Sequence, residues 1–192
     1  MGYSIRVVFF KATFIPLLIF KYMKLKYALI PLIGLFYSCQ TEAEDTSNID
    51  AFEKNSATVL AYLNGFQKES LDYDALFSEN AIMLNTKIGA TIDSIPIADI
   101  KLMDQAEWDL YDFEILGEIN LLPGVNSETK KVDGSVRYYG TWRTTKAATD
   151  STPEIQTDVR LYESFDFDEA GKIRYQQFYG DLTASDNILE GK

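Results

Sequence analysis

Four long strand-like stretches follow one another after Tyr111, and they constrain the fold more than any other feature of the sequence. Each is rich in β-branched and aromatic residues, which is typical of strands. Turn-forming or polar segments separate them, the last being "DEAGK" at residues 168–172. The predicted strands are residues 113–122, 135–145, 155–167 and 173–183. We expect them to form one antiparallel sheet, because short connections favour antiparallel neighbours.

The segment before Tyr111 has helical periodicity instead. Phe52, Val59 and Leu63 recur at helical spacing, which predicts a helix over residues 50–67 with Asp50 as its N-cap. Further predicted elements are a short helix capped by Asp72, a short strand at 81–84 and a helix from Pro96 to about Leu110. Helices followed by strands indicate an α+β domain with helices on one face of a curved sheet. We assign residues 49–185 to this domain and residues 186–192 to a frayed tail.

This order of elements is similar to that of the nuclear transport factor 2-like (NTF2-like) superfamily, which includes SnoaL-like polyketide cyclases and ketosteroid isomerases. The stretches "YGTWR" in a middle strand and "FDFDEAGKI" before the last strand add to the resemblance, which covers residues 51–183. The resemblance implies a cone-shaped α+β fold, in which N-terminal helices pack on the concave face of a curved antiparallel sheet. It also implies a pocket between sheet and helices, and homodimers as a common assembly.

The only cysteine of the chain, Cys39, lies where an apolar segment meets an acidic one. The stretch "MKLKYALIPLIGLFYSC", from Met23 to Cys39, has early lysines, an apolar run and a small residue before the cysteine. This is the order of a secretory signal peptide, and the apolar run, of about 11 residues, is short for a bilayer-spanning helix. Its end, "FYSC", resembles the lipobox of bacterial lipoproteins, in which the cysteine is lipidated and the signal is cut just before it.

We therefore expect residues 1–38 to be a signal region and residues 39–48 to contain the lipidated Cys39 and a flexible tether. The chain would reach its membrane partner through lipid, in the envelope of a bacterium and, for a Gram-negative one, at the outer membrane. A transmembrane anchor is the alternative, and it would bury several lysines in the bilayer at high cost. We take Met23 as the translation start, although a long signal with a split apolar core remains the other interpretation.

Charge and composition exclude several function classes. The chain has 29 acidic and 18 basic residues, and five of the basic ones but none of the acidic ones precede Cys39, so the remainder has a formal charge of −16. Such a domain repels phosphate backbones, so we expect no nucleic-acid partner. The sequence has no histidine, which is the commonest transition-metal ligand. We therefore predict no metal site and no cofactor.

Strand alternation predicts a polar row on an otherwise apolar sheet face. Glu163 shares a face with Leu161 and Phe165. Closing the "DEAGK" hairpin places Glu163 near Gln177, and closing the loop 146–153 places Tyr138 beside Glu163. The flanking residues of this predicted face are Trp142, Tyr175, Tyr179 and Asp181.

This row has two interpretations. In the first, Glu163 or Asp181 is a catalytic base and Tyr138 a donor, because a buried carboxylate tends to be poised for proton transfer. The ligand-binding residues would then be Trp142, Tyr175, Gln177 and Tyr179. In the second, the same side chains form a structural hydrogen-bond network. Asp181 and Glu163 are only chemically similar to the Asp base of ketosteroid isomerases, and the arginines of an epoxide-hydrolase-like site, Arg137, Arg143 and Arg160, point away in this register.

The leading hypothesis is a cell-envelope lipoprotein whose NTF2-like domain binds a small apolar or amphipathic ligand, or a protein partner, without a requirement for catalysis. The alternative is an isomerase- or cyclase-like enzyme. A third interpretation is a structural module that forms a homodimer and fills its aromatic face with its own side chains. A pocket of several hundred Å³ lined by Trp142, Tyr138 and Glu163 would favour the first two, and a filled core would favour the third.

Overall fold

A computed structural model describes residues 46–87, 89 and 94–192. These residues belong to one compact unit, Asp45–Lys192, with a hydrophobic core of its own. The predictions for the signal region, the Met23 start, Cys39 and residues 40–45 of the tether concern residues outside this description. Within the described ranges, no helix has the length and apolar character needed to cross a membrane.

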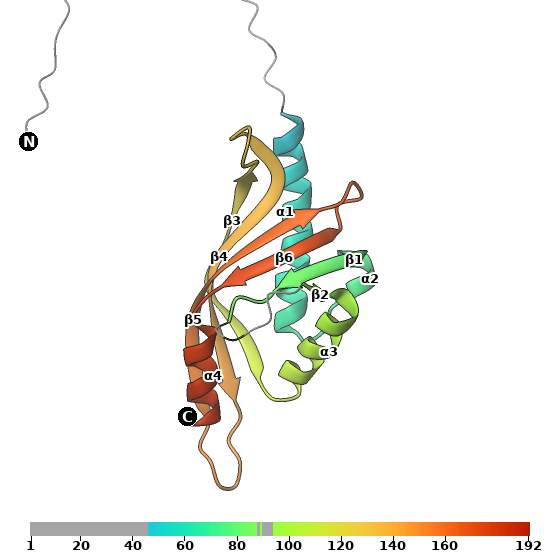
Figure 1. Ribbon diagram of the computed structural model, residues 1–192. Coiled ribbons are helices and arrows are strands. Elements are labelled where there is room, and N and C mark those ends of the chain that lie inside the picture. Colours follow the sequence, from blue (N-terminus) through green and yellow to red (C-terminus); the bar gives the residue numbers. More distant parts are fainter. Residues whose placement is uncertain (1–45, 88, 90–93) are drawn as a thin grey trace, which may run out of the picture. The chain divides into compact units, whose positions relative to one another are not determined.

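The described chain forms helices and strands in the α+β order that the sequence predicts. In chain order they are α1 (Ser47–Gln67), α2 (Tyr73–Leu76), β1 (Phe77–Leu84), β2 (Ile95–Pro96), α3 (Ile97–Trp108), β3 (Asp112–Val125), β4 (Val132–Lys146), β5 (Ile155–Phe167), β6 (Ile173–Tyr179) and α4 (Leu182–Glu190). The strands form one open sheet in the order β2-β1-β6-β5-β4-β3 (Figure 1). Neighbouring strands are antiparallel except β1 and β6, which are parallel, so the sheet is mixed.

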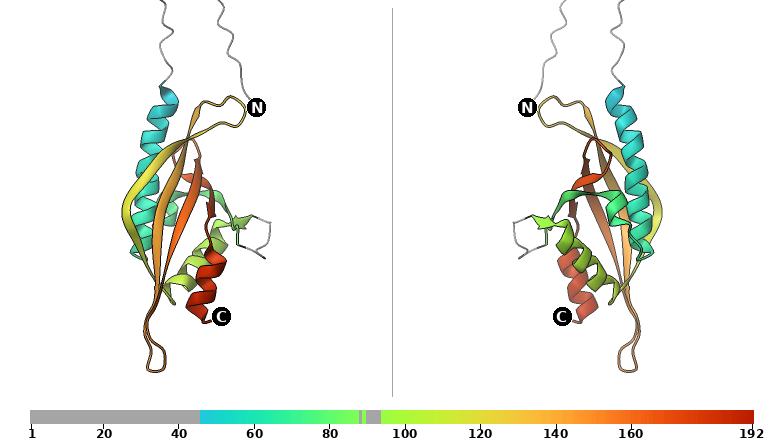
Figure 2. Two further views of the ribbon diagram at one scale, coloured as in Figure 1. Left: turned by 90° about the vertical axis from the view of Figure 1, so that its left-hand side faces the viewer. Right: turned by 90° about the vertical axis from the view of Figure 1, so that its right-hand side faces the viewer.

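The helices cover one face of a bent sheet. Helix α1 packs on β4 and β3, α3 packs on β1, and α4 packs on β5. Figure 1 shows α1 running along the long strands, with α3 and α4 toward the end where β4 and β5 are joined, and Figure 2 shows the bend of the sheet from two sides. The predicted packing of the N-terminal helices on the concave face is therefore confirmed. This arrangement leaves room for a site between the sheet and three helices.

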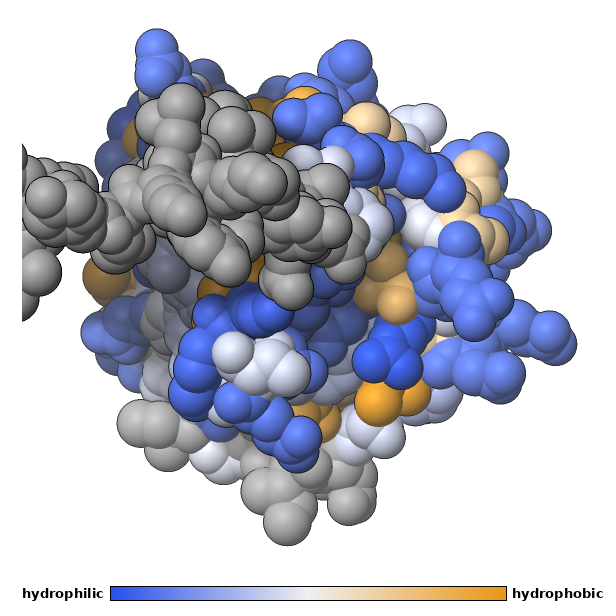
Figure 3. Space-filling view, turned by 90° about the horizontal axis from the view of Figure 1, so that it is seen from above, coloured by the Kyte–Doolittle hydropathy of each residue, from blue (hydrophilic) through white to orange (hydrophobic). Residues whose placement is uncertain are grey.

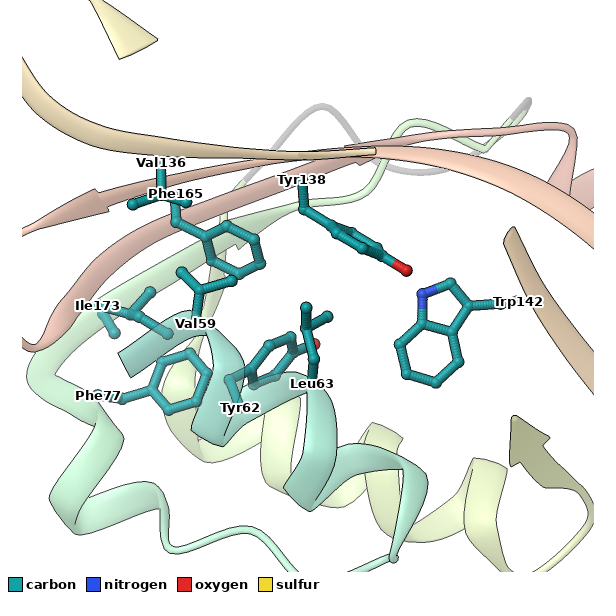
Figure 4. Close-up of a cluster of buried hydrophobic side chains, with 10 residues drawn as sticks. Val59, Tyr62, Leu63, Phe77, Val136, Tyr138, Trp142, Phe165 and Ile173 are labelled. Atoms are coloured by element: carbon teal, nitrogen blue, oxygen red, sulfur yellow. The ribbon is translucent and has the colours of Figure 1, made fainter. Parts of the chain in front are cut away.

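The core lies between α1 and the middle strands (Figure 4). Tyr62 of α1 is central, because its ring packs edge-on against Phe165 and Phe77, with ring centroids 5.5 Å and 5.8 Å away. The other buried members are Val59, Leu63, Ala81, Val136, Tyr138, Trp142 and Ile173. Those of α1 recur at helical spacing, and those of β4 fall on one face of the strand, which is why periodicity could predict these two sets.

Polar contacts hold α1 in place on the sheet. The buried Asn55 amide donates to the carbonyl of Gly134 at 2.9 Å, and the Thr58 hydroxyl donates to the carbonyl of Gly171 at 3.1 Å. Gly171 closes the β5–β6 turn with φ of +83°, a conformation that favours glycine. Because both contacts fix α1 on the sheet, they also set the positions of Tyr62 and Phe66, which lie in the following turns of the helix.

The strand register agrees with the sequence on one side of β5 and differs on the other. Tyr138 pairs with Glu163 across β4 and β5, as expected. On the other side Phe167 pairs with Ile173 as expected, but a bulge follows, so that Glu163 lies opposite Phe178. The predicted neighbours of Glu163 and Phe165 in the last strand, Gln177 and Tyr175, are therefore wrong. The bulge inserts one extra residue in β6 and turns each later side chain to the other face.

The ends of the domain also differ from prediction. Helix α1 begins at Ser47 with Thr46 as its N-cap, so it starts before Asp50 and includes residues placed in the tether. Strand β6 ends at Tyr179, and the expected frayed tail forms helix α4. The N-cap of α4 is Asp181, and a left-handed Gly191 ends the helix. The helix was not predicted because most of its residues are polar and its apolar face is short. Ser185 and Leu189 are its buried residues.

Gly140 makes room for the buried ring of Tyr138, which precedes it by two residues on the same strand face. A Cβ atom at Gly140 would lie 1.8 Å from the Tyr138 hydroxyl oxygen and 2.2 Å from the adjoining ring carbon. Tyr138 is fully buried, so its ring has little room to move. We expect Gly140→Ala to lower the free energy of unfolding by about 1–3 kcal/mol, as overpacking does. Urea unfolding measures this loss.

A double variant separates this clash from a general effect on β4. Tyr138→Leu removes the colliding ring, so adding Gly140→Ala to it should cost much less than in the wild type. Equal costs of Gly140→Ala in both backgrounds would contradict the assignment.

Candidate functional site

A cavity of about 170 Å³ lies on the helix-covered face of the sheet. Its walls come from α1, α3, α4 and the inner faces of the strands. Large apolar side chains make up most of the lining, among them Tyr62, Phe66, Phe113, Trp142, Leu161 and Phe178. The polar lining residues include Glu163, Gln176, Asp104, Glu107, Lys87 and Asp186. The site is therefore an aromatic-walled cavity with several carboxylates.

Glu163 is the most buried carboxylate of this site, with 4% of its surface exposed. Strand β5 places it on the inner face, because it alternates with Leu161 and Phe165. The side-chain amide of Gln176 donates to Oε2 of Glu163 at 3.2 Å and to the Tyr62 hydroxyl at 2.7 Å. The β6 bulge brings Gln176, and not Gln177, to this position. A buried Tyr62–Gln176–Glu163 network thus joins α1, β6 and β5.

Burial controls the ionisation of Glu163. Loss of hydration raises the pKa of this carboxyl group from 4.5 to about 7, and the Gln176 hydrogen bond opposes the shift only in part. A carboxyl group with such a pKa exchanges protons readily near neutral pH. The same burial, together with the charge of Glu163, raises the pKa of Tyr62 well above its usual value. Tyr62 therefore stays a neutral hydroxyl in this site.

Helix α3 contributes two further carboxylates. Asp104 accepts a hydrogen bond from the Tyr73 hydroxyl at 2.7 Å, and burial raises its pKa to about 6. Burial also raises the pKa of Glu107, which Lys87 partly opposes. Sequence reasoning missed both as site residues, because acidic residues on a short helix normally face water. Their spacing was the available signal, because Asp104 lies one helical turn after Ile100 and Glu107 one turn after Met103.

An ion pair lies among the lining residues of the same cavity. The Lys87 ammonium group contacts Asp186 of α4 at 2.6 Å, and both side chains are partly exposed. Sequence reasoning also missed this pair, because Asp186 was assigned to a frayed tail. Helix α4 therefore contributes directly to the site.

Two of the residues predicted for the site, Glu163 and Trp142, line the cavity. Tyr138 does not line it, and its hydroxyl faces the indole N–H of Trp142 (Figure 4). Burial and the nearby Glu163 raise the pKa of Tyr138 to about 12. Tyr175, Gln177 and Tyr179 lie on the opposite face of β6, where Gln177 links the two tyrosine hydroxyls at 2.9 Å and 2.8 Å.

Asp181 lies outside the cavity and has a structural contact. Its Oδ1 accepts a hydrogen bond from the backbone N–H of Ala184 at 3.2 Å, which is the N-cap contact of α4. Asp181 also borders a more open surface groove between β5 and α4. The three arginines occupy other faces, and Arg143 forms a two-point ion pair with Asp158.

We expect Asp181→Ala to lower the free energy of unfolding by about 1 kcal/mol, because α4 loses its N-cap acceptor. Asp181→Asn keeps an acceptor oxygen and should cost much less. Thermal unfolding of both variants tests this, and equal stability of the wild type and Asp181→Ala would contradict a capping role.

Metal-ligating side chains do not converge in this part of the chain. Within residues 46–87, 89 and 94–192, no group of three or more Asp, Glu, His or Cys residues could hold a metal ion. The carboxylates of the cavity are thus spread over its walls. They can accept hydrogen bonds or protons, and they can face a positive charge.

Known proteins share this fold. No protein-family model and no curated protein matches the sequence. A candidate polyketide cyclase from Xanthomonas campestris pv. campestris is 18% identical, with a TM-score of 0.55 over 72% of this chain and 98% of that chain. A candidate polyketide cyclase from Silicibacter sp. is 17% identical, with a TM-score of 0.54 over 71% and 95%. An NTF2-like protein from Burkholderia xenovorans is 10% identical, with a TM-score of 0.54 over 71% and 96%. At these identities the likeness establishes an NTF2-like fold.

Proposed function

We propose that this NTF2-like domain binds a small apolar or amphipathic molecule in its cavity, as the ligand-binding part of a lipid-anchored envelope protein. The observation that carries the proposal is the aromatic-walled cavity of about 170 Å³ with Glu163 buried in its wall. Binding sites for small molecules are typically apolar concavities with a few placed polar groups. Glu163 and Gln176 are such groups here.

The anchoring part of the proposal rests on the sequence. The single Cys39 follows an apolar run and a small residue, and an acidic tether follows it. Lipid on Cys39 would hold the domain at the membrane surface. The alternative to a small-molecule ligand is a protein partner, which could be a second copy of the same chain.

A proton-transfer reaction of the isomerase or cyclase kind is the second candidate function. The raised pKa of Glu163, about 7, favours it, because a general base works best with a pKa near the operating pH. Tyr62 is the hydroxyl that Gln176 places beside Glu163, whereas Tyr138 does not line the cavity. Structural neighbours that are candidate polyketide cyclases, such as those from Xanthomonas campestris and Silicibacter sp., agree with this candidate function. Turnover by the wild type but not by Glu163→Gln would support this function.

Native mass spectrometry on residues 40–192 tests the binding proposal. We expect the wild type to retain a small molecule from its host, or to form a 1:1 adduct with added benzyl alcohol. Leu161→Trp, which places a larger ring in the cavity wall, should retain neither. A wild type that forms no adduct, or adducts that persist equally in Leu161→Trp, would contradict a ligand site in this cavity. The same spectra report whether the domain is a monomer or a homodimer.

A further inference from the structure

We infer that the ligand of this cavity is an organic cation, a small amine or quaternary ammonium compound with an aromatic or aliphatic body. The inference rests on the proposed function, because it names the chemical class of the ligand for the same cavity. Three observations support it. Carboxylates outnumber basic groups among the described lining residues, the most buried carboxylate has no cationic partner in the described chain, and aromatic rings line the cavity.

Carboxylates outnumber basic groups on the cavity wall. Four carboxylates line it, from three separate elements: Glu163 of β5, Asp104 and Glu107 of α3, and Asp186 of α4. Lys87 is the only basic residue among the described lining residues, and it is already paired with Asp186 at 2.6 Å. An anionic ligand would meet uncompensated like charge, whereas a cation would neutralise it.

The deepest of these carboxylates lacks a cationic partner. Gln176 donates to Oε2 of Glu163, and within the described chain no donor contacts Oε1. Burying a carboxylate without a counter-charge is costly, and a cation at hydrogen-bond distance would offset that cost. The raised pKa values of Glu163 and Asp104, which both arise mainly from burial, agree with a site that lacks positive charge.

The walls suit the body of such a ligand. Rings of Phe66, Phe113, Trp142 and Phe178 surround the space, and aromatic faces attract cations as well as apolar groups. A cavity of about 150 Å³ is known to admit benzene, so 170 Å³ allows one ring with a short ammonium arm.

The rest of the domain would help such a ligand to approach. The part of the chain after Cys39 has a formal charge of −16, and hydrophilic residues dominate the described surface in Figure 3. A surplus of negative charge raises the local concentration of cations and speeds their association. A metal ion fits less well, because the described carboxylates do not converge on one point.

Three probes of nearly equal shape test the inference: benzylamine, which is cationic at neutral pH, benzyl alcohol, which is neutral, and benzoate, which is anionic. The protein is residues 40–192, since the compact unit Asp45–Lys192 contains both the core and the cavity. Calorimetric titration at pH 8 should give a Kd for benzylamine at least about tenfold below that for benzyl alcohol, with benzoate weakest. In Glu163→Gln the benzylamine preference should fall to about threefold or less, because an uncharged amide remains.

Matched variants keep the outcome interpretable. Glu118→Gln removes an exposed carboxylate on β3, which does not line the cavity, and should preserve the tenfold preference. If Glu163→Gln does not fold, Asp104→Asn removes charge from the α3 part of the wall and should reduce the preference as well.

Failure of the cation inference can be distinguished from failure of the proposed function. Equal binding of benzylamine and benzyl alcohol, or a benzylamine preference that survives in the folded Glu163→Gln and Asp104→Asn variants, would overturn the cation inference and leave a ligand-binding cavity. Absence of binding by all three probes would overturn the proposed function together with the inference.

Discussion

Glu163→Gln is expected to raise the free energy of unfolding by about 3 kcal/mol at pH 8 and to leave it within about 1 kcal/mol of the wild type at pH 4. The cause is the burial of a carboxyl group that must ionise without a cationic partner in the described structure. Its pKa is about 7 in the folded protein, compared with an ordinary value of 4.5. Glutamine has nearly the same shape and never ionises.

The pH range of this effect follows from the two pKa values. Below pH 4.5 the carboxyl group is protonated in both the folded and the unfolded chain, so it does not affect stability. Between pH 4.5 and about 7 the unfolded chain releases the proton and the folded protein holds it, so the wild type loses about 1.4 kcal/mol per pH unit. Above pH 7 the loss is complete. The difference between the variant and the wild type should therefore grow over this window only.

Urea unfolding at several pH values between 4 and 8 measures the difference. Glu118→Gln is the control, because its exposed carboxylate stays in water in both states, and it should change stability by less than about 0.5 kcal/mol at every pH. A Glu163→Gln variant that is less stable than the wild type at pH 8 would show that Glu163 is stabilised as an anion. An advantage that does not change with pH would show that burial does not raise the pKa of Glu163.

Cys39→Ser is expected to remove all acyl mass from the protein in a bacterial host and to prevent cleavage of the signal just before residue 39. The thiol is the nucleophile that would form the thioether to lipid, and a hydroxyl is a much weaker one. Each buried CH₂ group of an acyl chain contributes about 0.8 kcal/mol to membrane binding, so losing the chains removes the anchor. Intact mass spectrometry of the mature wild-type chain should show acyl groups on a polypeptide that begins at Cys39.

Two controls accompany this experiment. Gln40→Ala leaves the cysteine in place and should remain in the membrane fraction. A gene that starts at Met23 should yield the same mature protein, if that is the true start. A mature wild-type chain without added lipid mass, or acyl mass that persists in Cys39→Ser, would contradict lipidation.

Much of the fold could be predicted because this chain follows simple periodicities. The inner residues of β4, namely Val136, Tyr138 and Trp142, share one face of the strand with Gly140, and α1 repeats its apolar residues every three or four positions. Two features escaped prediction for physical reasons. A bulge changes register without any sequence signal as strong as a glycine or proline. Helix α4 is short and mostly polar, with only Ser185 and Leu189 buried, so its cap residues Asp181 and Gly191 were the available signals.

Part of the candidate site could also be predicted from the sequence. Glu163 and Trp142 were found because the strands that bear them are regular. Gln176 was missed for Gln177 because the bulge lies between Glu163 and the turn. Asp104 and Glu107 were missed because acidic residues on a short helix normally face water, although their spacing places them beside the apolar face that α3 turns toward the cavity. Site residues on regular strands could be found from the sequence. Site residues whose position depends on the β6 bulge or on the packing of helices could not.

The location of a bound probe tests the central claim most directly. We would measure nuclear Overhauser effects between benzylamine and the side chains of residues 40–192. A ligand in the cavity should give contacts to the methyl groups of Val159 and Leu161 and to the ring of Trp142, all of which line it. Contacts confined to the tyrosines stacked on the opposite face, Tyr139, Tyr162 and Tyr179, would contradict the account and assign binding to the outer surface of the sheet.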